Sequence, residues 1–151
     1  MQSDSFTSLA LTPQFLANLT TLGYDHMTQV QAETLPSVLA GSDLIAQAKT
    51  GSGKTAAFGI GILHRLNPAW FAVQGLVLCP TRELADQVAG ELRRLARGVG
   101  NVKILTLTGG VSMRPQIASL EHGAHIVVGT PGRIRDHLGR ATLDLSRVQT
   151  L

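Results

Sequence analysis

The segment at residues 48–55 constrains this chain more than any other, and it reads Ala-Lys-Thr-Gly-Ser-Gly-Lys-Thr. A strand-like apolar run at 43–47 precedes it, and an amphipathic helix-like run at 54–66 follows it. In that context the pattern predicts a phosphate-binding loop. Glycines at 51 and 53 let the backbone curl around an anion because they carry no Cβ. The loop N–H groups and the N-terminus of the helix then attract phosphate.

Two side chains in the loop predict nucleotide chemistry. Lys54 can reach the β- and γ-phosphates, and the Thr55 hydroxyl can bind Mg²⁺, so both are candidate catalytic residues. The alternative is a chance match, expected in roughly 1% of chains of this length, and the flanking elements make it rarer. The predicted nucleotide-binding residues here are Ala48, Thr50, Gly51, Ser52, Gly53, Lys54 and Thr55.

Composition narrows the class of protein. A chain of 151 residues with 44% apolar residues fits one domain with a real core. No apolar stretch approaches the ~20 residues that span a membrane, and the first residues do not resemble a signal peptide, so we expect a cytoplasmic protein. Cys79 is the one cysteine, which excludes an internal disulfide and predicts an inert core thiol. The net charge of +3 is weak evidence for nucleic acid.

The histidines show no metal-binding pattern. His122 and His125 are separated by Gly-Ala, with no third candidate ligand nearby. We therefore expect both to lie in solvent or at the edge of the core.

Helix-like and strand-like segments alternate along most of the chain. Helices are expected at 12–23, 28–41, 54–66, 82–97, 113–121 and 130–139, and strands at 43–47, 75–79, 102–107 and 125–129. The strands look buried on both faces, which predicts a doubly wound parallel α/β sheet.

Parallel strands place their C-terminal ends, and the helix N-termini that follow, along one edge of the sheet. A row of anion-binding turns on such an edge suits a polyanion better than one small ligand. The alternative is that these residues have structural roles, because Thr81 and Thr130 are also ordinary helix caps and Pro131 is an ordinary first-turn proline. Besides the phosphate loop, these turns are Pro80-Thr81-Arg82, Gly109-Gly110 and Thr130-Pro131-Gly132-Arg133.

These segments, in this order, resemble the motifs of the DEAD-box RNA helicases. Residues 48–55 are similar to motif I of that family, 80–85 to motif Ia, 109–110 to the GG element, 130–133 to motif Ib and 23–31 to the Q motif. The resemblance covers essentially the whole chain. The stretches 46–59 and 76–97 are especially similar to the bacterial DbpA subgroup, which acts on large-subunit ribosomal RNA.

The resemblance implies an ATP-dependent RNA helicase, in which RNA-stimulated ATP hydrolysis is coupled to local duplex unwinding in ribosomal large-subunit assembly. The implied cofactors are ATP and Mg²⁺, with Thr55 on the metal. The implied partners are a second RecA-like domain and the RNA sugar-phosphate backbone, with no membrane. The RNA-binding positions would be Pro80, Thr81, Arg82, Gly109, Gly110, Thr130, Gly132 and Arg133.

The resemblance also implies a site for adenine. A side-chain amide can pair with both the N6 donor and the N7 acceptor of adenine, and Gln31 would take that role. Phe6, 17 residues before Gly23, would pack on the base. The alternative is that Thr28 and Gln31 form a capping box. The family usually has proline where this chain has Met27, so we expect a looser helix entry.

The family's next elements, Asp-Glu-Ala-Asp and Ser-Ala-Thr, do not occur in this chain. We therefore expect a Q-motif region at 1–41 and an incomplete first RecA-like domain at 42–151, truncated before the strand of the acidic motif. Glu83 is more typical of an acid in the first turn of a helix than of a replacement for the missing acidic motif. Two alternatives stay open: a catalytically inactive ATP- and RNA-binding module, or a different phosphate-loop enzyme, such as a DNA helicase or a small kinase.

Overall fold

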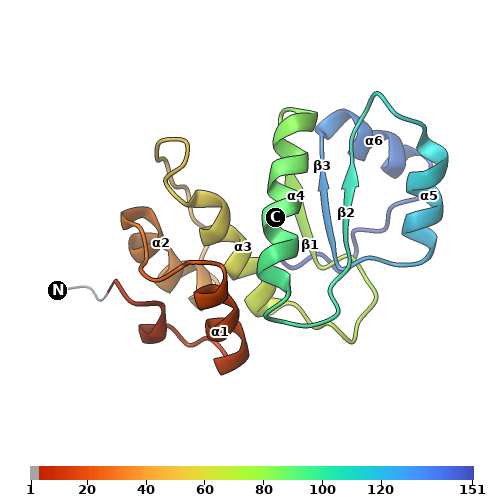
Figure 1. Cartoon of the computed structure of the whole chain (residues 1–151). Helices are drawn as coiled ribbons and strands as arrows, with labels where there is room; N and C mark the ends of the chain where they lie inside the picture. The colour runs from red at the N-terminus through yellow and green to blue at the C-terminus, as the bar shows by residue number, and fades with distance from the viewer. Residues whose placement is uncertain (1–3) are drawn as a thin grey trace. The chain divides into compact units, whose positions relative to one another are not determined.

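The structure is a computed structural model, and it describes residues 4–151. The chain forms two compact units (Figure 1). The N-terminal unit contains the chain up to residue 65 together with 94–100, and the sheet unit contains 66–93 and 101–151. Of the region predicted at 1–41, residues 1–3 lie outside the described residues.

The N-terminal unit is helical. It contains the 3-10 helix η1 (Phe6–Ser8), α1 (Pro13–Thr21), α2 (Gln29–Ala40) and α3 (Lys54–Arg65). The Thr12 hydroxyl caps α1, and Gly41 ends α2 in the left-handed region with φ +88°. Helices α2 and α3 pack against each other. Buried Leu19, Leu35 and Ile60 are among the residues that form this core.

The strand predicted at 43–47 is wrong. This segment is not part of any sheet within residues 4–151, and Ile45 is fully exposed at 100%. An apolar run becomes a strand only when a neighbouring strand takes its N–H and C=O groups. The phosphate loop therefore follows an unpaired segment in this structure.

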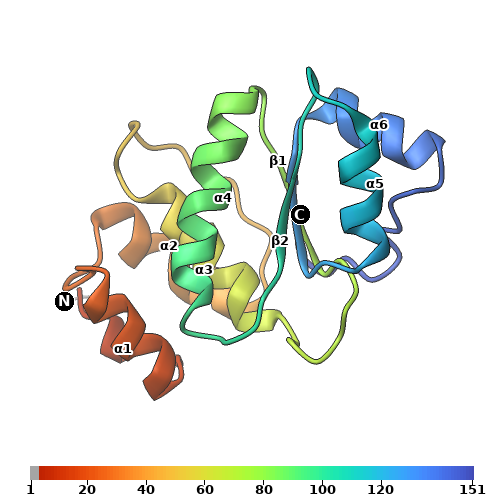
Figure 2. The same ribbon diagram turned by 45° about the vertical axis from the view of Figure 1, so that its right-hand side comes forward.

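The sheet unit is built on three parallel strands, β1 (Gly75–Leu78), β2 (Ile104–Leu107) and β3 (Ile126–Gly129), in the order β1-β3-β2. Gly75 and Ile104 both pair with Ile126 in the centre of the sheet. Helix α4 (Arg82–Ala96) covers one face, and α5 (Met113–Glu121) and α6 (Pro131–Gly139) cover the other (Figure 2). The predicted α/β class with a parallel sheet is confirmed.

Burial in the sheet unit follows this topology. Every residue of β3 is buried, whereas β1 ends at the half-exposed Leu78. The end of β3 lies close to α6, because a Cβ at Gly129 would come within 2.6 Å of Ile134 Cδ1. Leu107 and Val127 belong to the same apolar cluster as Ile134. This packing fixes the start of α6 at the end of the central strand.

One histidine prediction is wrong. His122 is exposed, but His125 is fully buried. The backbone N–H of Lys103 donates to His125 Nδ1 at 2.9 Å, so the other ring nitrogen donates to the Pro68 carbonyl, also at 2.9 Å. A histidine whose two ring nitrogens both have backbone partners can be buried without an unpaired polar group.

Cys79 is buried, as predicted, and burial raises the pKa of its thiol. None of the helices within residues 4–151 has the length and apolar character needed to cross a bilayer.

Candidate nucleotide and RNA sites

The phosphate loop lies in the N-terminal unit, at the start of α3. Gly51 and Gly53 have φ of +79° and +92°, the conformations for which glycine was predicted here. The Lys54 ammonium donates to the carbonyl oxygens of Ala48 and Lys49, the second at 3.0 Å. The chain therefore wraps around the lysine head group at the N-terminal end of a helix.

Two features of this loop fit a phosphate group. Ser52 Oγ is buried and has no hydrogen-bond partner, which is costly unless a ligand supplies one. Lys54 is half-buried and has only carbonyl oxygens as partners within the loop. Thr55, the second residue of α3, is also half-buried. An anion with several oxygen acceptors would satisfy these donors and the free N–H groups of the helix end.

Gln31 connects α2 to this loop. Its side chain is buried, with Oε1 accepting from the Thr28 backbone N–H at 2.9 Å and Nε2 donating to the Gly53 carbonyl at 3.1 Å. The Thr28 hydroxyl in turn accepts from the Gln31 backbone N–H, so the capping box is confirmed. A Cβ at Gly53 would come within 2.4 Å of Gln31 Nε2. The sequence did not predict this contact.

The other predicted adenine-site residue, Phe6, is buried against Tyr24, with ring centroids 6.2 Å apart in an edge-on arrangement. The Met27 backbone N–H donates to the Asp4 carbonyl at 2.6 Å. Proline has no N–H and could not make this bond. The entry to α2, which we expected to be looser with methionine, is held by it.

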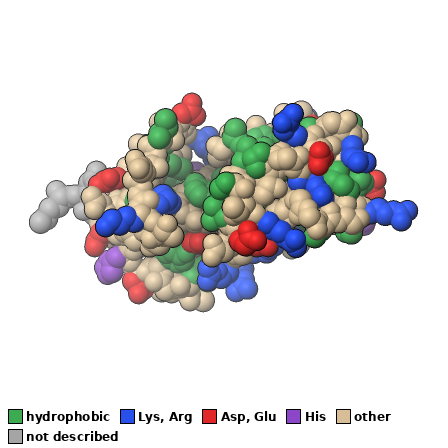
Figure 3. Space-filling view, turned by 90° about the horizontal axis from the view of Figure 1, so that it is seen from above, with side chains coloured by type: hydrophobic (Ala, Val, Ile, Leu, Met, Phe, Trp, Pro, Cys, Tyr) green, Lys and Arg blue, Asp and Glu red, His purple; other side chains and the backbone are tan. Residues whose placement is uncertain are grey.

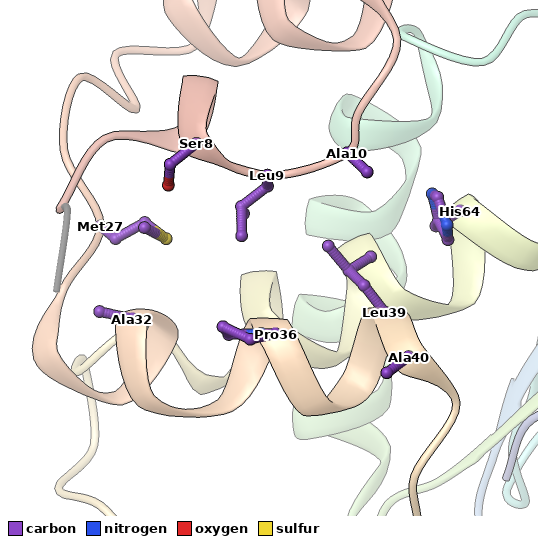
Figure 4. Close-up of a pocket in the computed structure, with 9 residues that line it drawn as sticks. All are labelled: Ser8, Leu9, Ala10, Met27, Ala32, Pro36, Leu39, Ala40 and His64. Atoms are coloured by element: carbon purple, nitrogen blue, oxygen red, sulfur yellow. The ribbon is translucent and has the colours of Figure 1, made fainter.

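A hollow of about 500 Å³ in the N-terminal unit lies apart from these residues. Figure 4 shows residues 8–10 on one side, α2 on the other and His64 of α3 at one end. None of the predicted nucleotide-binding residues lines it. The lining residues are Ser8, Leu9, Ala10, Met27, Ala32, Pro36, Leu39, Ala40 and His64.

The predicted RNA edge lies in the sheet unit, at the C-terminal ends of the parallel strands. Arg82 is exposed and lies beside the second predicted turn, because a Cβ at Gly110 would be 3.5 Å from Arg82 Nη1. Thr81 acts as a helix cap, accepting from the Leu84 N–H at 3.2 Å. Thr130 makes no capping hydrogen bond with its side chain. The capping alternative therefore holds for Thr81 and fails for Thr130.

Figure 3 views the molecule from the side toward which the strands point. Lys and Arg side chains are scattered over this face, with Asp, Glu and apolar side chains between them. Binding of a polyanion here would depend on backbone N–H groups and single arginines more than on a continuous basic patch.

The Arg133 side chain is only 10% exposed. Its Nη1 donates to Gln116 Oε1 at 3.2 Å, and its Nη2 donates to the Val111 carbonyl at 2.9 Å. Nε has no hydrogen-bond partner and lies 3.9 Å from Asp136 Oδ2. The guanidinium that we predicted to face RNA is mostly engaged within the protein.

Gln116 and His137 were not predicted from the sequence. Gln116 Nε2 donates to the Thr108 carbonyl at 3.0 Å, which leaves Oε1 to accept from Arg133 and, at 2.8 Å, from His137 Nε2. His137 Nδ1 lies 2.8 Å from the Thr142 hydroxyl, which can donate to it when the ring is neutral. Both side chains are buried. Their one signal in the sequence is a polar residue on the buried face of a short amphipathic helix.

Burial is the main cause that lowers the pKa of His137 below its ordinary 6.5, and the Arg133 guanidinium adds to this while Asp136 opposes it. The unfolded chain therefore takes up this proton at a higher pH than the folded chain. The contribution of neutral His137 to the free energy of unfolding is complete above about pH 6.5. It falls as the pH drops below 6.5 and levels off below the pKa that His137 has in the folded chain.

We expect the melting temperature of the wild-type chain to fall more between pH 7.5 and pH 5 than that of His137→Gln, because the variant lacks this titration. Thermal melts followed by circular dichroism over that range measure the difference. Parallel curves for the two proteins would contradict the assignment.

Comparison with known proteins identifies the family. The sequence profile of the DEAD/DEAH box helicases matches residues 28–151, which is most of the chain. The chain belongs to the DEAD/DEAH box helicase family. It is 58% identical over 148 residues to the ATP-dependent RNA helicase DbpA of Escherichia coli, a match that covers 97% of this chain and 32% of that protein. It is 47% identical to the ATP-dependent RNA helicase DeaD of Mycobacterium tuberculosis, covering 97% of this chain and 26% of that one.

A solved structure supports the same assignment. The crystal structure of a DEAD box protein from Methanococcus jannaschii matches with a TM-score of 0.89 and 42% identity, over 95% of this chain and 39% of that one. The DEAD-box chain described here thus spans about a third of the length of these relatives and contains part of the RecA-like domain.

Proposed function

We propose that this chain is part of the first RecA-like domain of an ATP-dependent RNA helicase, in which RNA-stimulated ATP hydrolysis drives local duplex unwinding. The observation that carries the proposal is the phosphate loop at the start of α3, where Ser52 Oγ is buried with no hydrogen-bond partner and the Lys54 ammonium donates to backbone carbonyl oxygens. The similarity to proteins named ATP-dependent RNA helicases supports it.

In the nucleotide site, Lys54 would bind the terminal phosphates, and Thr55 would supply a hydroxyl to Mg²⁺. The glycines and Ser52 would enclose the phosphates, with Ala48 and Thr50 completing the loop. ATP with its metal supplies the transferable phosphoryl group. Gln31 would recognise adenine, with Phe6 at the base, while its amide keeps the loop in place through Gly53.

In the RNA site, backbone N–H groups at the starts of α4 and α6 would bind phosphates without reading bases. Arg82 is exposed beside Gly110 and would add a direct charge. Thr130, whose hydroxyl caps no helix N–H, would donate to RNA as well. The remaining positions of this surface are Pro80, Thr81, Gly109, Gly132 and Arg133.

We also propose a cellular role for the protein, a partner domain and a division of this chain into two regions. The resemblance of residues 46–59 and 76–97 to the DbpA subgroup is the reason for proposing a role in ribosomal large-subunit assembly, in the cytoplasm. The activity would need a second RecA-like domain. Within this chain, residues 1–41 would form the Q-motif region and 42–151 the incomplete helicase domain.

In isolation, this chain would be a binding module without turnover. Glu83 lies in the first turn of α4, where the helix dipole favours an acid. Phosphoryl transfer without acidic groups on the metal and the attacking water lacks two of its usual parts.

We expect the chain to bind single-stranded RNA weakly and with little sequence preference, and not to hydrolyse ATP. The slope of log K against log salt should be about −1 to −2, since each neutralised phosphate contributes about −0.7. Fluorescence anisotropy with two unrelated RNAs measures this, and phosphate release is followed in the same samples.

Three outcomes would count against the proposal. A strong preference for one RNA, or no RNA binding, contradicts a backbone-reading edge. RNA-stimulated phosphate release that is lost in Lys54→Ala shows genuine turnover and contradicts the binding-module account, since contaminating enzymes would be unaffected by the variant.

A further inference from the structure

The turn at Gly109-Gly110 is held at both ends by two side chains that touch each other. Immediately before it, the Thr108 carbonyl accepts from Gln116 Nε2 at 3.0 Å. Immediately after it, the Val111 carbonyl accepts from Arg133 Nη2 at 2.9 Å. Gln116 Oε1 then accepts from Arg133 Nη1 at 3.2 Å, which joins the two ends. We call Gln116 and Arg133 the turn clamp.

The clamp residues are directed inward. Gln116 is 8% exposed as a residue, and the Arg133 side chain is 10% exposed. The orientation of the amide is fixed, because the Thr108 carbonyl requires a donor and the arginine requires an acceptor. His137, which is fully buried, donates a second hydrogen bond to the same Gln116 oxygen at 2.8 Å. Each member therefore fixes the geometry of the next.

We propose that Arg133 is a positioning residue of the RNA edge, acting through the turn clamp and without a direct contact between its charge and RNA. The clamp sets the conformation of a turn in which Gly110 has φ +79°. It also connects that turn to the first turn of α6, so that two sets of phosphate-binding N–H groups keep one spacing. This inference rests on the proposed RNA function of the edge.

Arg82 provides the contrast. It is exposed at the same edge and lies beside Gly110. A guanidinium that contacts phosphate releases a counterion, so its removal flattens the salt dependence of binding by about 0.7 per phosphate. A positioning guanidinium weakens binding at every salt concentration and leaves the slope unchanged. The salt slope therefore distinguishes the two roles, which a stability measurement alone would not.

The test compares Arg133→Ala, Arg133→Lys, Gln116→Met and the double variant Gln116→Met/Arg133→Lys with Arg82→Ala, all in the full chain. Anisotropy with a single-stranded RNA is measured over a salt series, and circular dichroism confirms folding. Amide hydrogen exchange at residues 109–111 reports on the turn without RNA.

We expect each single clamp variant to weaken RNA binding by roughly threefold to tenfold, as the loss of one or two hydrogen bonds implies, with the slope unchanged. Arg133→Lys should not restore RNA binding, because lysine cannot reproduce the planar, forked hydrogen-bond donors of the arginine guanidinium. The double variant should bind RNA no more weakly than whichever of Gln116→Met and Arg133→Lys binds it more weakly. Exchange at 109–111 should be faster in every clamp variant, and Arg82→Ala should flatten the slope.

The inference is overturned if Arg133→Ala flattens the slope by about 0.7 while Arg133→Lys binds like the wild type, since that is the result for a direct phosphate contact. It is also overturned if Gln116→Met binds RNA normally. If the wild-type chain binds no RNA, the proposed function of the edge fails. The turn clamp is then tested by amide hydrogen exchange alone, and unchanged exchange rates at residues 109–111 in the clamp variants would refute it.

Discussion

Replacing Lys54 by alanine should lower the affinity of the chain for ATP at least about tenfold. The ammonium already lies inside the loop, where the carbonyl oxygens of Ala48 and Lys49 accept from it. A phosphate would replace these with charge-assisted hydrogen bonds, each contributing about 1.5–3 kcal/mol. A loss of 1.4 kcal/mol corresponds to a factor of ten in affinity.

Titration with a fluorescent ATP analogue measures this effect, and Lys49→Ala is the matched control. Lys49 is an exposed neighbour in the same loop, and its removal changes the net charge by the same amount. We expect the control to bind the analogue nearly as well as the wild type. Equal affinities of Lys54→Ala and the wild type would show that the loop does not bind the nucleotide.

Replacing Gln31 by alanine should reduce the preference for ATP over GTP and lower stability at the same time. The substitution leaves the Thr28 N–H and the Gly53 carbonyl without their present partner. An unpaired buried group costs about 1–3 kcal/mol, so the unfolding free energy should fall by that order. If the amide also pairs with adenine, the ratio of ATP to GTP affinity should fall about tenfold.

Competition of ATP and GTP against the labelled analogue, together with thermal melts, separates the two roles of Gln31. Gln29→Ala is the control, because Gln29 is exposed at the start of the same helix and its side-chain amide donates to Glu33. Lower stability with an unchanged ATP to GTP ratio would mean that Gln31 serves only as a cap and a support for Gly53.

The elements that the sequence predicted correctly have local signals. Thr12-Pro13 and Thr28 mark the starts of α1 and α2, and Gly41 marks the end of α2. The alternation of short apolar runs with amphipathic helices predicted the parallel sheet of β1, β2 and β3. The loop at 48–55 was predicted because its glycines carry their own conformational signal.

The features that the sequence did not predict depend on contacts between residues far apart in the chain. Residues 43–47 have the composition of a strand, but a strand also needs a paired neighbour, which composition does not show. His125 is buried because Lys103 and Pro68, far away in sequence, supply its backbone partners. The turn clamp joins α5 and α6 across 17 positions of the chain. Contacts of this kind depend on how the elements pack, so they became visible only in the structure.

We propose that the phosphate loop of this DEAD-box chain binds nucleotide and selects adenine, and calorimetry tests this most directly. The wild-type chain is titrated with ATP and, separately, with GTP, each with Mg²⁺. We expect measurable ATP binding and GTP binding at least about tenfold weaker, because a wrong base leaves the Gln31 amide unpaired. Equal affinities for the two nucleotides, or no binding of ATP, would contradict it.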